Sequence, residues 1–350
     1  MILLLEKNAP EGASRDLLQL AARLGLPART MGGSWGRQAV EVDDPVPARL
    51  LRTLRAAPHV EELLSRPRAN PLVELEGDEG VRPVRVGDLA IGGGDLVLAA
   101  GPCAVESEDQ VEAAALAAAR SGARLLRGGA YKPRTRPGDF QGLGLQALRW
   151  MRAAADRHGL LVVTEALDPA SCDEVAEWAD VIQIGARTMQ ATSLLKAAAR
   201  SGRPVLLKRG LSATLDEWLG AAEYLAAGGA PGVILCERGS RSFETSTRFS
   251  LDVGVIAAAR LRTHLPILAD PSHPAGRRAL VRPLARAAIA AGADGLLVEA
   301  HPDPSCARCD GPQALLLDEL EDLAREMADV GASVGRTFAD PRERRAASGV

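Results

Sequence analysis

Residues 160–167 read LLVVTEAL, residues 181–186 read VIQIGA and residues 204–210 read PVLLKRG, and each of these short apolar runs contains or leads into a charged residue. The runs are apolar along most of their length, as expected of parallel strands that are covered on both faces. Stretches with helical periodicity lie between them. This alternation predicts consecutive β-α units built around one parallel sheet.

The same pattern occurs eight times after residue 95. The other five runs are residues 96–103, 124–130, 232–239, 266–273 and 295–302. Eight such units, spaced by about 20–35 residues, predict an α/β fold of the (β/α)8 TIM-barrel type over residues 96–333. A doubly wound open sheet is the alternative, although it usually has fewer strands. We expect a helix over residues 312–333 to complete the barrel and residues 334–350 to form a loose tail.

Residues 1–66 have the pattern of a small α+β unit. Strands are predicted at 2–7, 37–44 and 59–66, with helices at 14–26 and 46–58. The turn MGGSWG separates the strand at 37–44 from a further middle strand that precedes the turn. Ser14 is the expected N-cap of the first helix. The order β-α-β-β-α-β is that of a ferredoxin-like domain. Residues 67–95 are rich in Pro and Gly and predict a linker, in which residues 85–94 form a hairpin closing one end of the barrel.

Composition narrows the class of protein. The chain has 350 residues, of which 47% are hydrophobic, and this length fits a barrel of about 250 residues plus a small domain. A net charge of −3 gives no support for a nucleic-acid or membrane surface. No apolar run reaches the roughly 20 residues that span a bilayer, and MILLLEKNAP lacks the features of a signal peptide. Five cysteines without a disulfide-like pattern predict a cytoplasmic protein.

The ends of the predicted strands carry polar and charged groups. In a TIM barrel these ends converge on one mouth, so residues far apart in the sequence become neighbours. We expect this mouth to hold the site. The groups are Cys103, Arg127, Glu165, Arg187, Lys208, Arg209, Glu237, Arg238, Asp270, His273, Glu299 and His301.

One subset of these groups has the chemistry of metal ligands. It consists of Cys103, His273 and Glu299, with Asp310 just beyond the last strand. A thiolate, an imidazole and two carboxylates suit a borderline divalent ion such as Mn, Fe, Co or Zn. Each residue alone has a structural interpretation, because buried cysteines are usually inert and single histidines often satisfy core contacts. Four of them at separate strand ends favour a metal site.

A second subset is cationic. Its members are Arg127, Lys132, Arg134, Arg187, Lys208 and Arg238. So many cations at one mouth would repel each other unless anions occupy the site, which predicts a pocket for phosphate or carboxylate groups. Gly128, Gly129 and Gly185 are expected to let a substrate approach the backbone. The alternative is a set of exterior salt bridges with nearby acidic residues.

Lysine is rare in this chain. Only Lys7, Lys132, Lys196 and Lys208 occur among 42 basic residues, so arginine supplies nearly all of the positive charge. Unlike arginine, a lysine has a compact charge and a pKa that its surroundings can tune. Lys132 and Lys208 therefore favour a functional role at the strand ends, although chance placement is the alternative.

Several motifs together resemble one enzyme family. They are AGPCAVES, LRGGAYKPRT, FQGLG, TEALDP, QIGAR, LLKRG, ILCERG, ADPSH, AGRR and VEAHPDP. With them the chain resembles the 3-deoxy-D-arabino-heptulosonate 7-phosphate (DAHP) synthases, in the branch with an N-terminal ferredoxin-like regulatory domain. The resemblance covers nearly the whole chain. It implies a transferase of the shikimate pathway of aromatic amino acid biosynthesis, which condenses phosphoenolpyruvate with erythrose 4-phosphate and water.

The resemblance also implies roles for single residues. Cys103, His273, Glu299 and Asp310 would ligate one divalent metal ion. The residues implied to hold phosphoenolpyruvate are Arg127, Lys132, Gly185, Ala186, Arg187, Lys208 and Arg238. The motif KPRT (Lys132, Pro133, Arg134 and Thr135) would bind erythrose 4-phosphate. Lys132 lies between the two substrates and is the expected proton donor, so Lys132, Cys103 and His273 form the predicted catalytic set.

The resemblance has alternatives and departures. The related octulosonate 8-phosphate synthases share the barrel and the metal set, but carry an Asn-Arg-Ser type motif in place of KPRT. A barrel reused as a non-enzymatic binding subunit would be expected to lack the metal and cationic residues. Arg136 stands where relatives have a small hydroxylic residue. Cys309 replaces a serine and creates Cys306-x-x-Cys309, which is either neutral variation or the sign of a redox-sensitive metal site.

The N-terminal unit is the expected place of regulation. By resemblance, such domains sense tyrosine or phenylalanine in homotetramers of the barrel. A domain needed only for assembly is the alternative, because small α+β units serve many functions.

Overall fold

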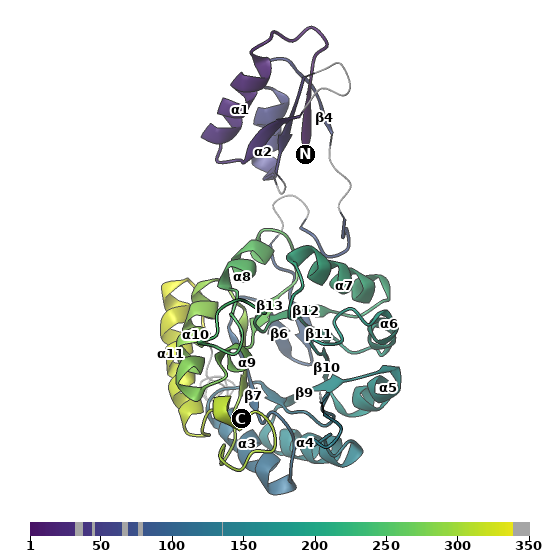
Figure 1. Cartoon of the computed structure of the whole chain (residues 1–350), viewed down its shortest axis with the longest axis vertical. Helices are drawn as coiled ribbons and strands as arrows, with labels where there is room; N and C mark the ends of the chain where they lie inside the picture. The colour runs from purple at the N-terminus through teal and green to yellow at the C-terminus, as the bar shows by residue number, and fades with distance from the viewer. Residues whose placement is uncertain (32–37, 44–45, 65–68, 76–79, 135, 339–350) are drawn as a thin grey trace. The chain divides into compact units, whose positions relative to one another are not determined.

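The chain divides into two compact units, residues 1–80 and 81–350 (Figure 1). The structure is a computed structural model, and it describes residues 1–31, 38–43, 46–64, 69–75, 80–134 and 136–338. Each unit has its own hydrophobic core. Among the described residues, no helix has the length and apolar character needed to cross a membrane.

The first unit is an antiparallel sheet with two helices. Its elements are β1 (Ile2–Leu5), α1 (Ala13–Arg23), β2 (Ala28–Met31), β3 (Ala39–Val42), α2 (Ala48–Arg55) and β4 (Val60–Leu64). The strand order β2-β3-β1-β4 places β1 at the centre, where it pairs antiparallel with β3 and β4. Leu3, Leu5, Leu17, Val40 and Leu54 form the centre of the core. The predicted β-α-β-β-α-β order is confirmed.

The predicted cap of α1 is wrong. Gly12 is the N-cap and offers no side chain, and Ser14 is the second residue of the helix. The backbone N–H of Ser14 donates instead to Gln38 Oε1 at 3.3 Å. A side chain from elsewhere in the unit thus satisfies a first-turn donor that a local cap would otherwise serve. Except for Met31, the predicted turn MGGSWG lies outside the described residues.

The second unit is a closed barrel of eight parallel strands. The strands are β7 (Val97–Gly101), β8 (Leu125–Arg127), β9 (Leu161–Ala166), β10 (Val181–Ile184), β11 (Val205–Lys208), β12 (Val233–Glu237), β13 (Ile267–Ala269) and β14 (Gly295–Glu299). Pairing of β14 with β7 closes the barrel, with Glu299 opposite Gly101. The predicted TIM barrel is therefore confirmed.

Helices form a ring around the strands (Figure 1). They are α3 (Glu108–Arg120), α4 (Leu145–His158), α5 (Pro169–Trp178), α6 (Thr192–Arg200), α7 (Leu215–Ala227), α8 (Val253–Arg260), α10 (Arg278–Ala290) and α11 (Glu319–Ser333), with the short α9 (Ser272–Ala275) after β13. Capping boxes start α5 at Asp168 and α7 at Thr214. The reciprocal bonds of Thr214 and Glu217 satisfy backbone donors at the start of α7.

A hairpin closes the amino end of the barrel. It consists of β5 (Val84–Val86) and β6 (Leu89–Ile91), paired antiparallel. Val84 and Ile91 pack in one core cluster with Val97, Leu125 and Val181, which are the first residues of three barrel strands. Because apolar side chains fill this end, the opening that can receive a substrate is at the carboxyl end.

The last helix begins later than predicted. Residues 312–318 do not continue α11, which starts at Glu319. Leu315 instead pairs with the end of β14, since its N–H donates to Glu299 O at 2.9 Å and its carbonyl accepts from His301 N at 2.9 Å. Strand-like pairing with the residues at the end of β14 therefore overrides the helical pattern of the local sequence.

The segment after α11 makes contacts with the barrel. Arg336 Nε donates to Gly94 O at 2.9 Å, its guanidinium pairs with Asp294, and Thr337 bridges to Asp95. The predicted loose tail therefore starts no earlier than residue 338, and residues 339–350 lie outside the described residues.

Candidate active site

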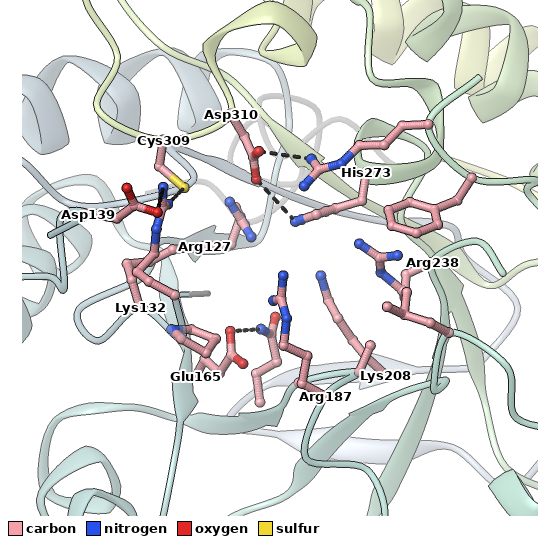
Figure 2. Close-up of a pocket in the computed structure, with 18 residues that line it drawn as sticks. Arg127, Lys132, Asp139, Glu165, Arg187, Lys208, Arg238, His273, Cys309 and Asp310 are labelled. Carbon is pink, nitrogen blue, oxygen red and sulfur yellow. Dashed lines mark hydrogen bonds and ion pairs between the residues drawn. The ribbon is translucent and has the colours of Figure 1, made fainter. Parts of the chain in front are cut away.

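The carboxyl ends of the strands surround a pocket (Figure 2). Its lining is strongly polar and combines cations, carboxylates and one thiol. The lining residues are Arg127, Lys132, Pro133, Arg134, Asp139, Glu165, Gln183, Gly185, Ala186, Arg187, Lys208, Leu211, Arg238, Arg248, Phe249, His273, Cys309 and Asp310. The pocket therefore includes the six predicted cations and two of the four predicted metal ligands.

The four predicted ligands lie together. The ligand atoms of Cys103, His273, Glu299 and Asp310 all lie within 4.8 Å of one another. Cys103 Sγ lies 3.3 Å from Asp310 Oδ2, and His273 Nε2 lies 3.4 Å from Glu299 Oε1. Residues from the ends of β7, β13 and β14, together with the loop before α11, thus converge on one point.

Asp270 orients the imidazole of His273. Its Oδ2 lies 2.6 Å from His273 Nδ1, which leaves Nε2 directed at the ligand cluster. Burial alone would raise the pKa of Asp270, but His273 and Lys208 hold the pKa of this carboxyl well below its usual range. Burial lowers the pKa of His273, although Asp270 and Glu299 oppose that effect. The neutral ring that results is the form that binds a metal.

Gln313 and Arg248 hold the two carboxylates of the cluster. Gln313 Nε2 donates to Glu299 Oε2 at 2.6 Å, and Arg248 donates to Gln313 Oε1 at 3.0 Å. Arg248 also pairs with Asp310 Oδ1 at 2.8 Å, so that Oδ2 remains on the side of Cys103. Neither residue was predicted from the sequence, because neither stands at a strand end and Gln313 lies in a segment predicted to be helical.

This donor set fits a divalent metal ion. The side chain of each ligand has a second partner that orients it, as is typical of metal centres. A hydrogen bond with Cys309 and burial raise the pKa of the Cys103 thiol well above its ordinary value. A bound cation offsets such a shift, because coordination deprotonates a thiol. We therefore find the residues suited to a borderline ion.

The six predicted cations all line the pocket, and their partners differ. Lys208 pairs with Asp270 at 2.5 Å and Arg127 with Glu299 at 3.2 Å. Within the described part of the chain, no ion pair joins Arg187 or Arg238 to a carboxylate, and both guanidinium groups are directed into the pocket (Figure 2). Burial lowers the pKa of Arg238. A bound anion would offset this cost of burying a charge.

Arg238 is further held by an aromatic ring. Its guanidinium lies 4.6 Å from the centroid of the Phe249 ring, and Arg248 lies 5.6 Å from the same ring. The N–H of Phe249 donates to Pro274 O at 3.1 Å, next to His273. The ring therefore orients a cation of the pocket from a loop that is also fastened near the ligand cluster.

Lys132 is buried between the pocket and the ligand cluster. Its Nζ lies 2.9 Å from Cys103 O and 3.1 Å from Cys103 Sγ. Burial alone would lower the pKa of Lys132, but the neighbouring sulfur atoms of Cys103 and Cys309 raise it above its ordinary value. The ammonium group is therefore held charged at neutral pH, which favours an electrostatic role.

The glycines make room for side chains of the protein. A Cβ at Gly185 would lie 2.0 Å from Glu165 Oε1, and one at Gly129 would lie 2.5 Å from Lys132 Cδ. Glu165 also accepts a hydrogen bond from Gln183 Nε2 at 3.2 Å. A side chain at either position would therefore displace Glu165 or Lys132. The expected approach of a substrate to this backbone stays a prediction.

The residues that depart from the family pattern differ in their position relative to the pocket. Arg136 is exposed and is not among the described residues that line the pocket. Thr135 lies outside the described residues. Cys309 lines the pocket and accepts a hydrogen bond from Arg134 at 2.8 Å, whereas Cys306 is exposed.

Comparison with known proteins matches this barrel and its site to one family. The model of the DAHP synthetase I family matches residues 73–335, which is most of the chain. The chain belongs to the DAHP synthetase I family. Phospho-2-dehydro-3-deoxyheptonate aldolase from Thermotoga maritima is 42% identical over 338 residues, covering 96% of this chain and 99% of its own length.

Solved structures and more distant relatives agree with this family. The crystal structure of the Thermotoga maritima DAHP synthase superposes with a TM-score of 0.76 at 40% identity, covering 97% of this chain and 98% of that one. A truncated form of the Thermotoga maritima synthase covers 78% of this chain and 100% of its own, with a TM-score of 0.72. A 2-dehydro-3-deoxyphosphooctonate aldolase from Nitrobacter hamburgensis is 35% identical over 250 residues, covering 66% of this chain and 86% of its own length.

Proposed function

We propose that this protein condenses phosphoenolpyruvate with erythrose 4-phosphate and water, and releases DAHP and phosphate. The observation that carries the proposal is a four-ligand cluster beside a pocket lined by six predicted cations, in a chain that matches a phospho-2-dehydro-3-deoxyheptonate aldolase along nearly its whole length. The reaction is the first step of the shikimate pathway.

The metal site has a defined set of residues under this proposal. Cys103, His273, Glu299 and Asp310 would hold one divalent ion, of Mn, Fe, Co or Zn type. When bound, the ion supplies Lewis-acid polarisation of the aldehyde oxygen of the aldose. Asp270 keeps His273 in the tautomer that presents Nε2, and Gln313 fixes the rotamer of Glu299.

The cations hold and orient phosphoenolpyruvate. Arg187 and Arg238 have no carboxylate partner among the described residues and are positioned to bind its phosphate and carboxylate oxygens. Arg127, Lys208 and the backbone of Gly185 and Ala186 complete this half of the pocket. With the substrate oriented, its enol carbon attacks the aldehyde carbon, water adds to the carbon that carries the phosphate oxygen, and phosphate leaves. Fixed cations favour this redistribution of negative charge.

The aldose phosphate is assigned to the KPRT segment. Pro133 and Arg134 line the pocket next to Lys132, and Thr135 is proposed to complete the set by resemblance. Arg134 is held by Asp139 at 3.4 Å and by Cys309, so its guanidinium already lies at the pocket wall. Lys132 stands between the two substrate positions and is proposed to hold charge, and to donate a proton, at the reacting carbonyl.

A substrate panel tests the reaction. With phosphoenolpyruvate and added divalent metal, we expect phosphate release with erythrose 4-phosphate to exceed that with arabinose 5-phosphate by ~100-fold or more, because a pocket with matched polar contacts rejects a substrate that leaves them unpaired. Release is measured with a phosphate assay, and the product by mass spectrometry. Omitting the aldose is the control for simple phosphatase activity. Faster release with arabinose 5-phosphate would reassign the protein to octulosonate 8-phosphate synthesis.

We propose a regulatory function for the first unit. Its independent core and ferredoxin-like sheet support a separately folded effector domain, and the resemblance adds tyrosine or phenylalanine as effectors in a homotetramer.

The cysteines of the structure are all free, which supports a reducing cytoplasm.

Deleting the first unit tests its function. A chain that starts at Val81, where the second unit begins, is expected to keep its activity. In the full chain, tyrosine or phenylalanine is expected to change the initial rate by ~5-fold or more, and the shortened chain is expected not to respond. Initial rates are measured with and without each amino acid, with glycine as the control ligand, and sedimentation gives the oligomeric state. Equal responses of the two chains would leave the unit with an assembly role.

A further inference from the structure

Two thiols meet beside the ligand cluster. Cys103 Sγ and Cys309 Sγ lie 3.1 Å apart, although the two residues are 206 positions apart in the sequence. Both are free thiols in the structure. The proposed reaction assigns Cys103 to the metal, and it uses Cys309 only to accept the hydrogen bond of Arg134.

Cys309 is a neighbour of the ligand set and not one of its members. The tight group of ligand atoms found among the described residues contains Cys103, His273, Glu299 and Asp310, but not Cys309. Arg134 donates to Cys309 Sγ at 2.8 Å, and Lys132 donates to Cys103 Sγ at 3.1 Å. Each sulfur is thus held by its own cation, and the two sulfurs face each other.

Only one of the pair lines the pocket. Both side chains are buried, but Cys309, at 7% exposed, is part of the pocket lining, whereas Cys103, at 3% exposed, is absent from it. A small polar oxidant that enters with the substrates would therefore reach Cys309 first. Cys103 lies directly behind it as the resolving thiol.

We propose that Cys103 and Cys309 form a modification site for hydroperoxides, which closes into a disulfide and switches off metal binding. This inference rests on the proposed metal-dependent function. The Cys309 sulfur attacks one oxygen of hydrogen peroxide and the O–O bond breaks. This step releases one water and converts the Cys309 thiol to a sulfenic acid. Cys103 sulfur then attacks the Cys309 sulfur and expels a second water. Two thiols and one peroxide thus give one disulfide and two waters.

The geometry allows this bond. A disulfide needs a sulfur separation of about 2.05 Å, so the two sulfur atoms, now 3.1 Å apart, must approach by about 1 Å. The bond removes the sulfur ligand from the cluster and ties it to the residue next to Asp310. A metal ion already bound to Cys103 competes with the same sulfur, so the metal-free protein is the more sensitive form.

Cys306 provides a matched control within the same loop. It forms the Cys-x-x-Cys motif with Cys309, but its side chain is exposed and its Sγ donates to Asp303 O at 3.2 Å. A conventional interpretation of the motif would pair Cys306 with Cys309. The structure instead brings Cys103 to Cys309, and the two pairings give different cross-linked peptides.

The experiment uses the full-length protein freed of metal with a chelator. Wild type, Cys309→Ser and Cys306→Ser are treated with hydrogen peroxide, with and without prior loading of Zn²⁺. Peptide mapping under non-reducing conditions identifies the linked cysteines, and competition with a chromogenic chelator measures Zn²⁺ affinity. Each variant is compared with its own untreated sample, before and after dithiothreitol.

The expected result is specific to one pair. After peroxide treatment, wild type and Cys306→Ser each lose two thiols and give a cross-linked Cys103–Cys309 peptide. Both then bind Zn²⁺ at least ~10-fold more weakly, and dithiothreitol restores the Zn²⁺ affinity. Cys309→Ser keeps its affinity at the same dose, and prior Zn²⁺ slows bridging in wild type. Equal loss in Cys309→Ser, a Cys306–Cys309 peptide, or a loss that dithiothreitol does not reverse would overturn the proposal. These measurements use no substrate, so a failure of the disulfide proposal can be distinguished from a failure of the proposed synthase reaction.

Discussion

Replacing Cys103 with alanine is expected to lower metal-dependent turnover by more than ~100-fold while the barrel remains folded. Loss of a residue that only orients a metal ligand typically costs 10–100-fold, and loss of the ligand itself should cost more. Cys103 is the one sulfur in the four-ligand cluster, and its removal leaves an imidazole and two carboxylates. Turnover is measured across a titration of Mn²⁺ and Zn²⁺, together with thermal unfolding.

Cys306→Ala is the matched control for this variant. Cys306 is exposed and outside the cluster, so its turnover and metal dependence should equal those of wild type. Similar unfolding temperatures for both variants would separate a metal effect from loss of fold. Wild-type activity in chelator-treated, metal-free buffer would refute the metal site itself, whatever the variant does.

Replacing Lys132 with arginine is expected to lower kcat by ~100-fold or more, although the positive charge is kept. Proton transfer and charge placement at a reacting group typically contribute 10²–10⁴-fold. Lys132 reaches Cys103 through a narrow space that exists because residue 129 is glycine, where a Cβ would lie 2.5 Å from Lys132 Cδ. The broader guanidinium plane does not fit this path, so the charge moves away from the reacting carbonyl.

The kinetic pattern distinguishes the role of Lys132 from simple anion binding. A fall in kcat at nearly constant KM for phosphoenolpyruvate indicates an interaction made in the transition state, whereas a rise in KM alone indicates uniform binding. Lys196→Arg is the matched control, because it makes the same substitution on the exposed face of α6, away from the pocket. Near-normal turnover of Lys132→Arg would remove its proposed role.

The fold could be predicted because its signals are local. Continuous apolar runs that alternate with helical segments identify all eight barrel strands, and the structure places each strand within its predicted range. Three of the four predicted ligands and four of the six cations followed from the rule that strand ends converge on one mouth, whereas Asp310, Lys132 and Arg134 lie in segments that follow strands. That rule needs only the position of a residue relative to its strand, which periodicity supplies.

The errors arise where contacts between distant residues override the local pattern. Gln38 replaces a local cap at the start of α1, and pairing of Leu315 with β14 separates α11 from the short 3-10 helix Gly311–Gln313. The sequence also did not show that the glycines at 129 and 185 make space for Lys132 and Glu165. In each case the deciding partner lies elsewhere in the sequence.

The sequence by itself determined the two-unit architecture, the barrel and the chemistry available at its mouth, because strand and helix periodicity and the order of elements are local properties. Only the tertiary structure decided which groups touch. It placed Arg248 and Gln313 behind the predicted metal ligands, and it brought Cys309, rather than Cys306, against Cys103. The physical reason is that loop residues have no periodicity from which side-chain direction can be read, so these contacts appear only when the barrel closes.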